Sequence, residues 1–305
     1  MVLSGADLYW TDWSRATVKT VPTAGGTTKT LWVGANSAHA LATDGTNLYA
    51  AYQSGSVFQI PLAGGAPTTI MQDGDDASYV ASDGKNVYWM GLYGHAIAQA
   101  PVGGGASAPV ASPTAGSGLV VDATNLYWID AGKLQRRPLA GGSIGALGAV
   151  PGFVYGVTSD SANVYVASEV STSGTTSTVI TKAPKNGNAP VQLATSSGKS
   201  TAIAVDVANV YWTNPDNHLV MVVPLSGGTV ATIAAGQSPS SLAVAGGYLY
   251  WNDIAGLMRA RVAGGIGTPE MLAPKFAWPA ALLSDGQNIY WAEDSSGTVG
   301  KWSPN

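Results

Sequence analysis

The chain of 305 residues carries 14 Lys and Arg against 18 Asp and Glu, for a formal net charge of −4, and it has no Cys. Charged residues make up 10% of it, against about 25% in a typical soluble domain. The lack of a basic patch argues against nucleic-acid binding. The lack of Cys excludes disulfides, thiolate zinc sites and a cysteine nucleophile. No apolar run reaches the ~18 residues of a membrane span, so we expect no membrane insertion.

A strand motif centred on tyrosine recurs along the chain, first as Asp-Leu-Tyr-Trp-Thr-Asp at 7–12. The central tyrosines are Tyr9, Tyr49, Tyr88, Tyr127, Tyr165, Tyr211, Tyr250 and Tyr290. Successive intervals are 38 to 40 residues, except for the 46 residues between the fifth and sixth copies. Glycine-rich turns such as Gly25-Gly26 and Gly64-Gly65 repeat with the same period. A regular period of this length predicts an array of structural repeats.

Each repeat predicts four short strands, illustrated by the second one. Its strands are expected at 39–43, 47–52, 56–60 and 67–71. Asp-Gly and Gly-Gly turns favour hairpins, because these residues tolerate a positive φ. Four antiparallel strands repeated every ~40 residues are typical of a β-propeller blade. We therefore expect one all-β domain, residues 1–305, with eight four-stranded antiparallel blades, of which the first and last are incomplete; seven blades is the alternative.

The first motif copy, Tyr9-Trp10-Thr11-Asp12, reads YWTD, and the other copies are graded versions of it. The chain thus resembles the YWTD β-propeller superfamily, the lipoprotein-receptor-type propellers and their secreted bacterial relatives. The resemblance implies an extracellular or periplasmic protein that binds proteins or glycans, although related propellers include metal-dependent lactonases and lyases. Receptor-type members have six blades, and the fourth motif position here holds Tyr52, Gly91 and Ser168 in three repeats instead of Asp. Met1 leads into Val2-Leu3-Ser4-Gly5 without a basic and apolar leader, so we expect a secretion signal to be either absent or already removed from this sequence.

The repeated tryptophans share one strand position and their tyrosine neighbours occupy the opposite face. We expect both faces to pack against adjacent blades, so these rings form the core and not a stacking platform for ligands. Burying one such ring removes ~150–250 Å² from water, which corresponds to ~4–6 kcal/mol before conformational entropy is subtracted. The set comprises Trp10, Trp89, Trp128, Trp212, Trp251 and Trp291.

The two ends of the blades differ in sequence. The turns joining strands one and two, and strands three and four, are near copies, and we call this side the repeated end. The turns joining strands two and three and the links between blades differ in every repeat, and they form the variable end, where sites are usually built. Aromatic and cationic residues there are the candidate ligand contacts: Trp13, Tyr52, Tyr93, Phe153, Lys275, Phe276 and Trp278. The alternative is that some of these rings plug the junction between the first and last blades.

An acidic run, Asp73, Asp75 and Asp76, is the candidate metal site, because clustered carboxylates suit calcium. The alternative is a solvated turn, and no other cofactor is expected. His39, His95 and His218 belong to separate repeats and are not expected to form one metal site. Other carboxylates at the variable end are expected to cap backbone N–H groups: Asp12, Asp130, Asp216, Asp253, Glu293 and Asp294.

The longer fifth interval inserts a Ser/Thr-rich segment at 168–177, which predicts an extended hairpin that is either a docking flap or without function. The chain has no Gly-x-Ser-x-Gly elbow, His-Glu-x-x-His motif or P-loop. We therefore expect a non-catalytic binding module that recognises a glycan, peptide or protein surface at its variable end. The alternatives are a metal-dependent hydrolase or lyase and a purely structural module of an envelope protein.

Overall fold

The computed structural model describes residues 1–34, 38–52, 55–72, 77–91, 96–236, 238–274, 279–293 and 299–303. These residues form strands throughout, apart from two single-turn 3-10 helices, η1 (Trp13–Arg15) and η2 (Pro215–Asn217). They group into two compact units, one comprising 1–131 and 135–145 and the other 132–134 and 146–305. None of the helices in the described part of the chain has the length and apolar character needed to span a bilayer.

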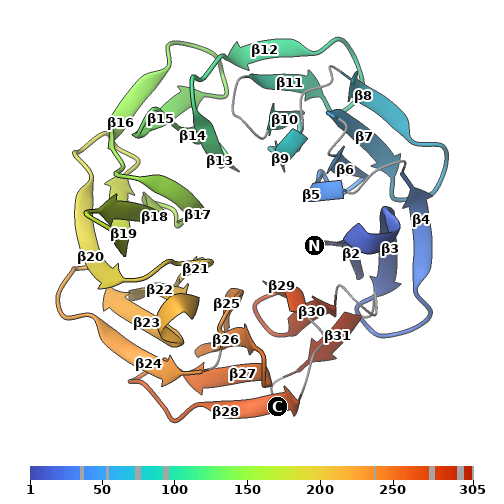
Figure 1. Cartoon of the computed structure of the whole chain (residues 1–305). Helices are drawn as coiled ribbons and strands as arrows, with labels where there is room; N and C mark the ends of the chain where they lie inside the picture. Colours follow the sequence, from blue (N-terminus) through green and yellow to red (C-terminus); the bar gives the residue numbers. More distant parts are fainter. Residues whose placement is uncertain are drawn as a thin grey trace. The chain divides into compact units, whose positions relative to one another are not determined.

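The first unit contains three complete sheets, and the boundary between the units runs through a fourth (Figure 1). In each sheet, strands adjacent in sequence pair in antiparallel fashion. The strands are β1 (Val2–Ser4), β2 (Asp7–Asp12), β3 (Thr17–Pro22) and β4 (Lys29–Val33); β5 (Ala38–Thr43), β6 (Asn47–Tyr52), β7 (Ser56–Pro61) and β8 (Thr68–Gln72); β9 (Ala77–Ser82), β10 (Asn86–Gly91), β11 (Ile97–Pro101) and β12 (Ala108–Ala111); and β13 (Gly116–Val121), β14 (Asn125–Asp130), β15 (Lys133–Pro138) and β16 (Gly145–Ala149).

The second unit repeats this topology in four further sheets, and the last of them has three described strands. Its strands are β17 (Phe153–Ser159), β18 (Asn163–Thr172), β19 (Thr175–Pro184) and β20 (Val191–Ser197); β21 (Ile203–Val205), β22 (Asn209–Asn214), β23 (Leu219–Pro224) and β24 (Ala231–Ala235); β25 (Leu242–Ala245), β26 (Tyr248–Asp253), β27 (Gly256–Arg261) and β28 (Glu270–Pro274); and β29 (Pro279–Ser284), β30 (Ile289–Glu293) and β31 (Val299–Trp302).

These eight antiparallel sheets are the blades of a β-propeller, which confirms the fold class predicted from the repeats. The expected second-repeat strand 47–52 coincides with β6. The first blade, which was expected to be incomplete, has four strands, and the first of them is the three-residue β1. Nothing in the structure tests whether residues 1–305 form one domain, and that statement stays a prediction.

The aromatic pairs of the repeat hold neighbouring blades together. The tyrosine of one blade and the tryptophan of the next lie in the same buried cluster, because successive side chains of a strand point to opposite faces of the sheet. Four such pairs are Tyr49 with Trp89, Tyr88 with Trp128, Tyr165 with Trp212, and Tyr211 with Trp251. The predicted structural role of these rings is therefore confirmed.

Candidate functional site

The repeated end is built on an aspartate in the turn between the first two strands of a blade. In the second blade, Asp44 Oδ1 accepts hydrogen bonds from the backbone N–H groups of Thr46 and Asn47 at 2.7 and 2.6 Å, and its Oδ2 accepts from the Tyr49 hydroxyl at 2.8 Å. The hydrogen bond from the tyrosine hydroxyl recurs in five further blades. In each of them the tyrosine donates to the aspartate five residues before it: Asp83, Asp122, Asp160, Asp206 and Asp285. These aspartates therefore fix the turn and the core tyrosine.

Burial and this carboxylate together control the ionisation of the repeated tyrosines. Both favour the neutral phenol, because the buried ring is desolvated and its hydroxyl donates to a negative acceptor. They raise the pKa of Tyr88 and Tyr127 to about 12. These turns were predicted to be scaffold, and the constant spacing of five residues between Asp and Tyr is the sequence signal from which this hydrogen bond could have been predicted.

The predicted capping of backbone N–H groups is confirmed for four aspartates of the variable end, whereas Asp294 and the side chain of Glu293 lie outside the described residues. Asp12 accepts from Ser14 Oγ, the Arg15 N–H and guanidinium, and Lys19 Nζ, the last at 2.6 Å. Asp130 accepts from the N–H groups of residues 114 and 115, Asp216 from that of residue 199, and Asp253 from that of residue 255. Within the described ranges, no three His, Asp or Glu side chains come together as a metal site.

Several candidate site residues lie outside the described residues, and their roles stay predictions. The side chain of Trp13 falls in this group, although its backbone starts η1. The others are Tyr93, Lys275, Phe276 and Trp278 among the ligand contacts, Asp73, Asp75 and Asp76 of the acidic run, and His95.

Tyr52 was expected to face a ligand, but it lies in the core, with 1% of its surface exposed. Its ring meets Phe58 edge-on, with 5.3 Å between the ring centroids. Gly34 makes room for it, because a Cβ at Gly34 would lie 2.4 Å from the Tyr52 ring. Burial raises the pKa of Tyr52 to about 12. Tyr52 therefore occupies the motif position of the aspartate, but it serves as a packing residue of the core.

Phe153, in contrast, is exposed at the variable end of the fifth blade. It starts β17, and 66% of its surface is open to solvent. Its ring contacts that of Tyr155 edge-on, with centroids 5.2 Å apart, and Tyr155 is itself 40% exposed. The Tyr155 hydroxyl donates a 2.5 Å hydrogen bond to Glu169 Oε2, and Ser171 donates to the other carboxylate oxygen at 3.2 Å. The result is an exposed aromatic pair beside a held carboxylate.

Two backbone features place these side chains. The pairing of β17 with β18 shifts between Val154 and Gly156, so Tyr155 is an extra residue in a β-bulge. A bulge re-aims a side chain, and here both aromatic residues are exposed while Val154 is buried. Gly152 precedes them with a φ of +73°, and a Cβ there would lie 1.8 Å from the Glu169 carbonyl oxygen. Only glycine permits this approach of the chain to β18.

Negatively charged side chains from two blades act on the Tyr155 hydroxyl. The hydrogen bond to Glu169, burial and the negative charges of Glu169 and Asp216 all raise the pKa of the Tyr155 hydroxyl. Asp216 belongs to η2 of the sixth blade and accepts a 3.0 Å hydrogen bond from the Lys199 N–H. Phe153 was predicted from the sequence, whereas Tyr155, Glu169 and Asp216 were not predicted as its neighbours, because only the pairing of β17 with β18 and the position of the sixth blade bring them together.

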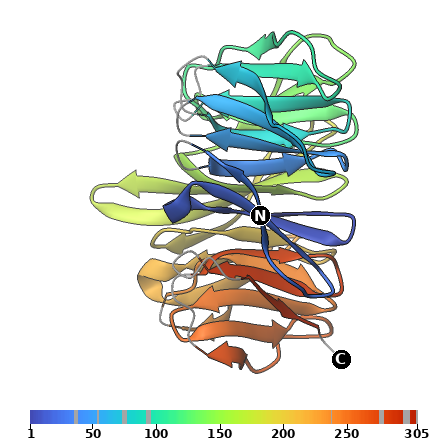
Figure 2. The same ribbon diagram turned by 90° about the vertical axis from the view of Figure 1, so that its right-hand side faces the viewer.

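The predicted extension of the fifth blade is an ordered hairpin. β18 and β19 have ten residues each, and Glu169 pairs with Thr178, three residue pairs before the last pair of the ladder. Ser173 and Gly174 close it with φ values of 50° and 82°, as a tight primed turn requires. In Figure 2 the hairpin, drawn in yellow-green, extends past the other strands of its own sheet. It rises next to the Phe153–Tyr155 pair.

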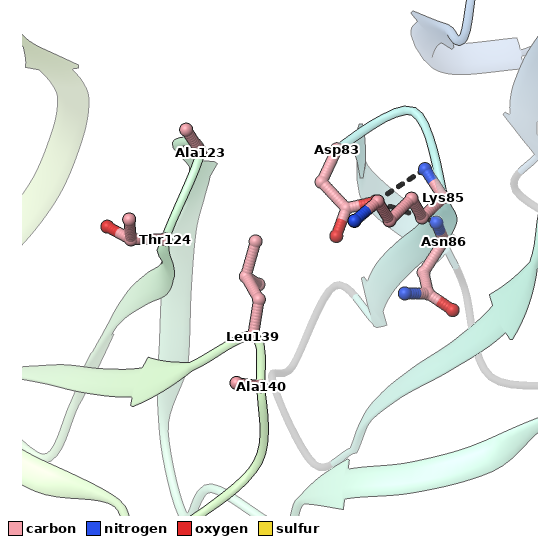
Figure 3. A pocket seen from close by; sticks show the side chains of 7 residues that line it. All are labelled: Asp83, Lys85, Asn86, Ala123, Thr124, Leu139 and Ala140. Atoms are coloured by element: carbon pink, nitrogen blue, oxygen red, sulfur yellow. Dashed lines mark hydrogen bonds between the residues drawn. The ribbon is translucent and has the colours of Figure 1, made fainter.

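Among the described residues, cavities lie at two places of the repeated end, which was predicted to be scaffold only. One, of about 370 Å³, lies between the third and fourth blades beside Asp83, Lys85 and Leu139 (Figure 3). The other, also about 370 Å³, lies between the sixth and seventh blades beside Val222 and Val262. Each falls within one unit of the chain. The turns at this end are near copies in sequence, but the two cavities between neighbouring blades have different lining residues.

The chain matches no protein-family model and no curated protein. Among solved structures it is similar to the computationally designed protein Ika8, with 13% identity, 99% of this chain and 95% of that chain covered, and a TM-score of 0.76. It is also similar to BamB from Moraxella catarrhalis, with 12% identity, 100% of both chains covered and a TM-score of 0.66. A streptogramin B lyase matches with 10% identity, 87% of this chain and 92% of that chain covered, and a TM-score of 0.57.

These similarities show the propeller fold. A designed protein and a lyase share it, and a fold of this kind supports unrelated activities. The function of the present chain therefore has to be argued from its own surface.

Proposed function

We propose that the protein is a non-catalytic binding module whose ligand contacts the variable end of the fifth blade. The contact surface comprises Phe153, Tyr155, Glu169 and the tip of the β18–β19 hairpin. The observation that carries the proposal is the 66% exposed Phe153 ring, which is held on a strand and not on a loop. The exposed part of an aromatic ring contributes little to folding, whereas a ligand that covers it gains apolar contact.

The chemistry of this surface suits a ligand with both an apolar face and hydrogen-bond donors. The two rings offer aromatic edges and faces, and Glu169 still has acceptor capacity beyond its bonds from Tyr155 and Ser171. Sugar rings and peptide side chains both combine these properties. We accordingly propose a glycan, a peptide or a protein surface as the ligand.

We further propose a place for the chain among YWTD-type propellers and a location outside the cytoplasm. The support is the motif at Tyr9-Trp10-Thr11-Asp12, its seven graded copies, and the low content of charged residues. Detection of the native protein in a cell-envelope or culture-medium fraction, and not with cytosolic markers, is the expected result.

The binding proposal is tested with the full chain on a glycan array and a peptide array, followed by titration of the best probe. We expect Phe153→Ala to weaken binding of that probe at least tenfold, because an aromatic contact at the centre of a small site contributes more than about 1.4 kcal/mol. Both the variant and the parent should unfold at the same temperature, since Phe153 is exposed.

The matched control is Val207→Ala, which removes a 99% exposed side chain at the repeated end. It should leave binding unchanged. Equal affinity of the parent and Phe153→Ala for every probe would contradict the proposed site.

A further inference from the structure

The residue that pairs with the core tyrosine is apolar in the sixth blade. Across from each core tyrosine, the third strand of the blade supplies a partner residue. In the described pairs these partners are Thr20, Gln59, Gln99, Lys182, Val222, Arg259 and Lys301. Val222 is the apolar member of this set, and it is buried.

In two blades the long partner side chain bridges to the next blade. Lys182 Nζ donates a 2.9 Å hydrogen bond to the Leu225 carbonyl oxygen, and Gln59 Nε2 donates to the Val102 carbonyl oxygen at 3.3 Å. Leu225 and Val102 hold equivalent places, directly after the proline that ends the third strand. In each case the N–H of that residue donates back to the turn between the first two strands of its own blade. The bridge therefore connects one blade to a fixed carbonyl of the next.

Val262 is the equivalent acceptor for the sixth blade. Its N–H donates to the Gly247 carbonyl oxygen at 2.9 Å, as the N–H of Leu225 does to Ala208. Val222 has no amine or amide to reach it. The cavity of about 370 Å³ lies here, lined by Val222 and Val262 together with Tyr211, Pro224 and Ile266. It therefore occupies the place that the Lys182 side chain fills one blade earlier.

We propose that this cavity binds a primary alkylammonium ion. The alkyl chain lies along Val222, Pro224 and Val262, and the ammonium group donates to the Val262 carbonyl oxygen, as Lys182 does to Leu225. The Tyr211 hydroxyl at this site is bonded to the Asp206 carboxylate at 2.7 Å, which adds a negative charge favourable to a cation. The inference is independent of the variable end, and it concerns the opposite side of the blades.

In the test, the full chain is titrated with n-butylammonium chloride at neutral pH, and binding is measured by saturation-transfer NMR. We expect saturable binding with a dissociation constant in the millimolar range, as about five heavy atoms permit. Tetramethylammonium, which has no N–H donor, should bind at least tenfold more weakly. Absence of saturable n-butylammonium binding overturns the proposal.

Two variants test whether the cavity at Val222 is equivalent to the space that the Lys182 side chain fills. Val222→Lys supplies the missing side chain, so we expect it to abolish n-butylammonium binding and to unfold at the same or a higher temperature than the parent. Lys182→Val vacates the equivalent space in the fifth blade, so the stoichiometry of n-butylammonium should rise from one to two. Unchanged binding by a folded Val222→Lys variant, or an unchanged stoichiometry in Lys182→Val, overturns the proposal.

Discussion

Single carboxylates stabilise this propeller by accepting several hydrogen bonds each. Asp12 is 2% exposed and is held by Ser14, Arg15 and Lys19. Asp285 is held by two turn N–H groups, an asparagine and Tyr290. Burial opposes their ionisation, but these donors outweigh it and lower the pKa of both carboxyl groups to about 2. Folding therefore favours the charged form of both residues.

The pH dependence of stability follows from Asp12. Its pKa is about 2 in the folded state and about 3.9 in the unfolded state, so its stabilisation is complete above about pH 5 and is lost as the pH falls towards 2. We expect Asp12→Asn to lower the free energy of unfolding at pH 7 by about 1–3 kcal/mol. Urea unfolding at pH 7, 4 and 2.5 should show the gap between parent and variant closing at the acid end. A gap that stays constant would contradict this assignment.

At the scale of elements, the β18–β19 hairpin is the main departure from the repeat. Its ladder continues from the core of the fifth blade to the Ser173–Gly174 turn without a break in register. The blade itself is anchored below this extension, where Val166, Ala167 and Ile180 are fully buried. We therefore expect the part of the hairpin beyond the Ser177–Ser197 pair to be dispensable for the blade and available for contact with a ligand.

Replacing residues 171–176 with Asn-Gly tests this separation. Val170 pairs with Ser177 two residue pairs before Thr172 pairs with Thr175, so it is the same type of pair and a two-residue primed turn can close the shortened hairpin there. We expect the unfolding temperature to change by only a few degrees, and affinity for the probe selected on the arrays to fall at least threefold. Unchanged affinity would mean that the extension has no part in binding. A large loss of stability would show that it supports the blade.

At the scale of the whole molecule, the low charge is the dominant property. With 14 basic and 18 acidic residues in 305, small changes in protonation alter the net charge by a large fraction. The expected isoelectric point is about 5.2. Repulsion between molecules is weakest where the net charge vanishes.

We therefore expect self-association to be strongest near pH 5. Static light scattering from pH 4 to 8 should give its lowest second virial coefficient there and higher values at pH 8. The folded state should be retained at pH 5, since Asp12 and Asp285 remain ionised at that pH. A minimum well away from pH 5 would show that apolar contacts, and not net charge, control association.

The sequence by itself determined the repeat, the strands and the blade core. Strand pairing, turn chemistry and the two-residue alternation of Tyr and Trp are local properties, so β6 falls at 47–52, where the pattern predicts it. The tertiary structure decided which side chains are exposed. Tyr52 is buried because Gly34 and Phe58 enclose it, whereas Tyr155 is exposed at the bulge of β17, although the residue in the same bulge of the fourth blade, Gly118, is buried. The cavity at Val222 likewise depends on what the neighbouring blade places opposite it, and a residue's exposure depends on such neighbours distant in sequence.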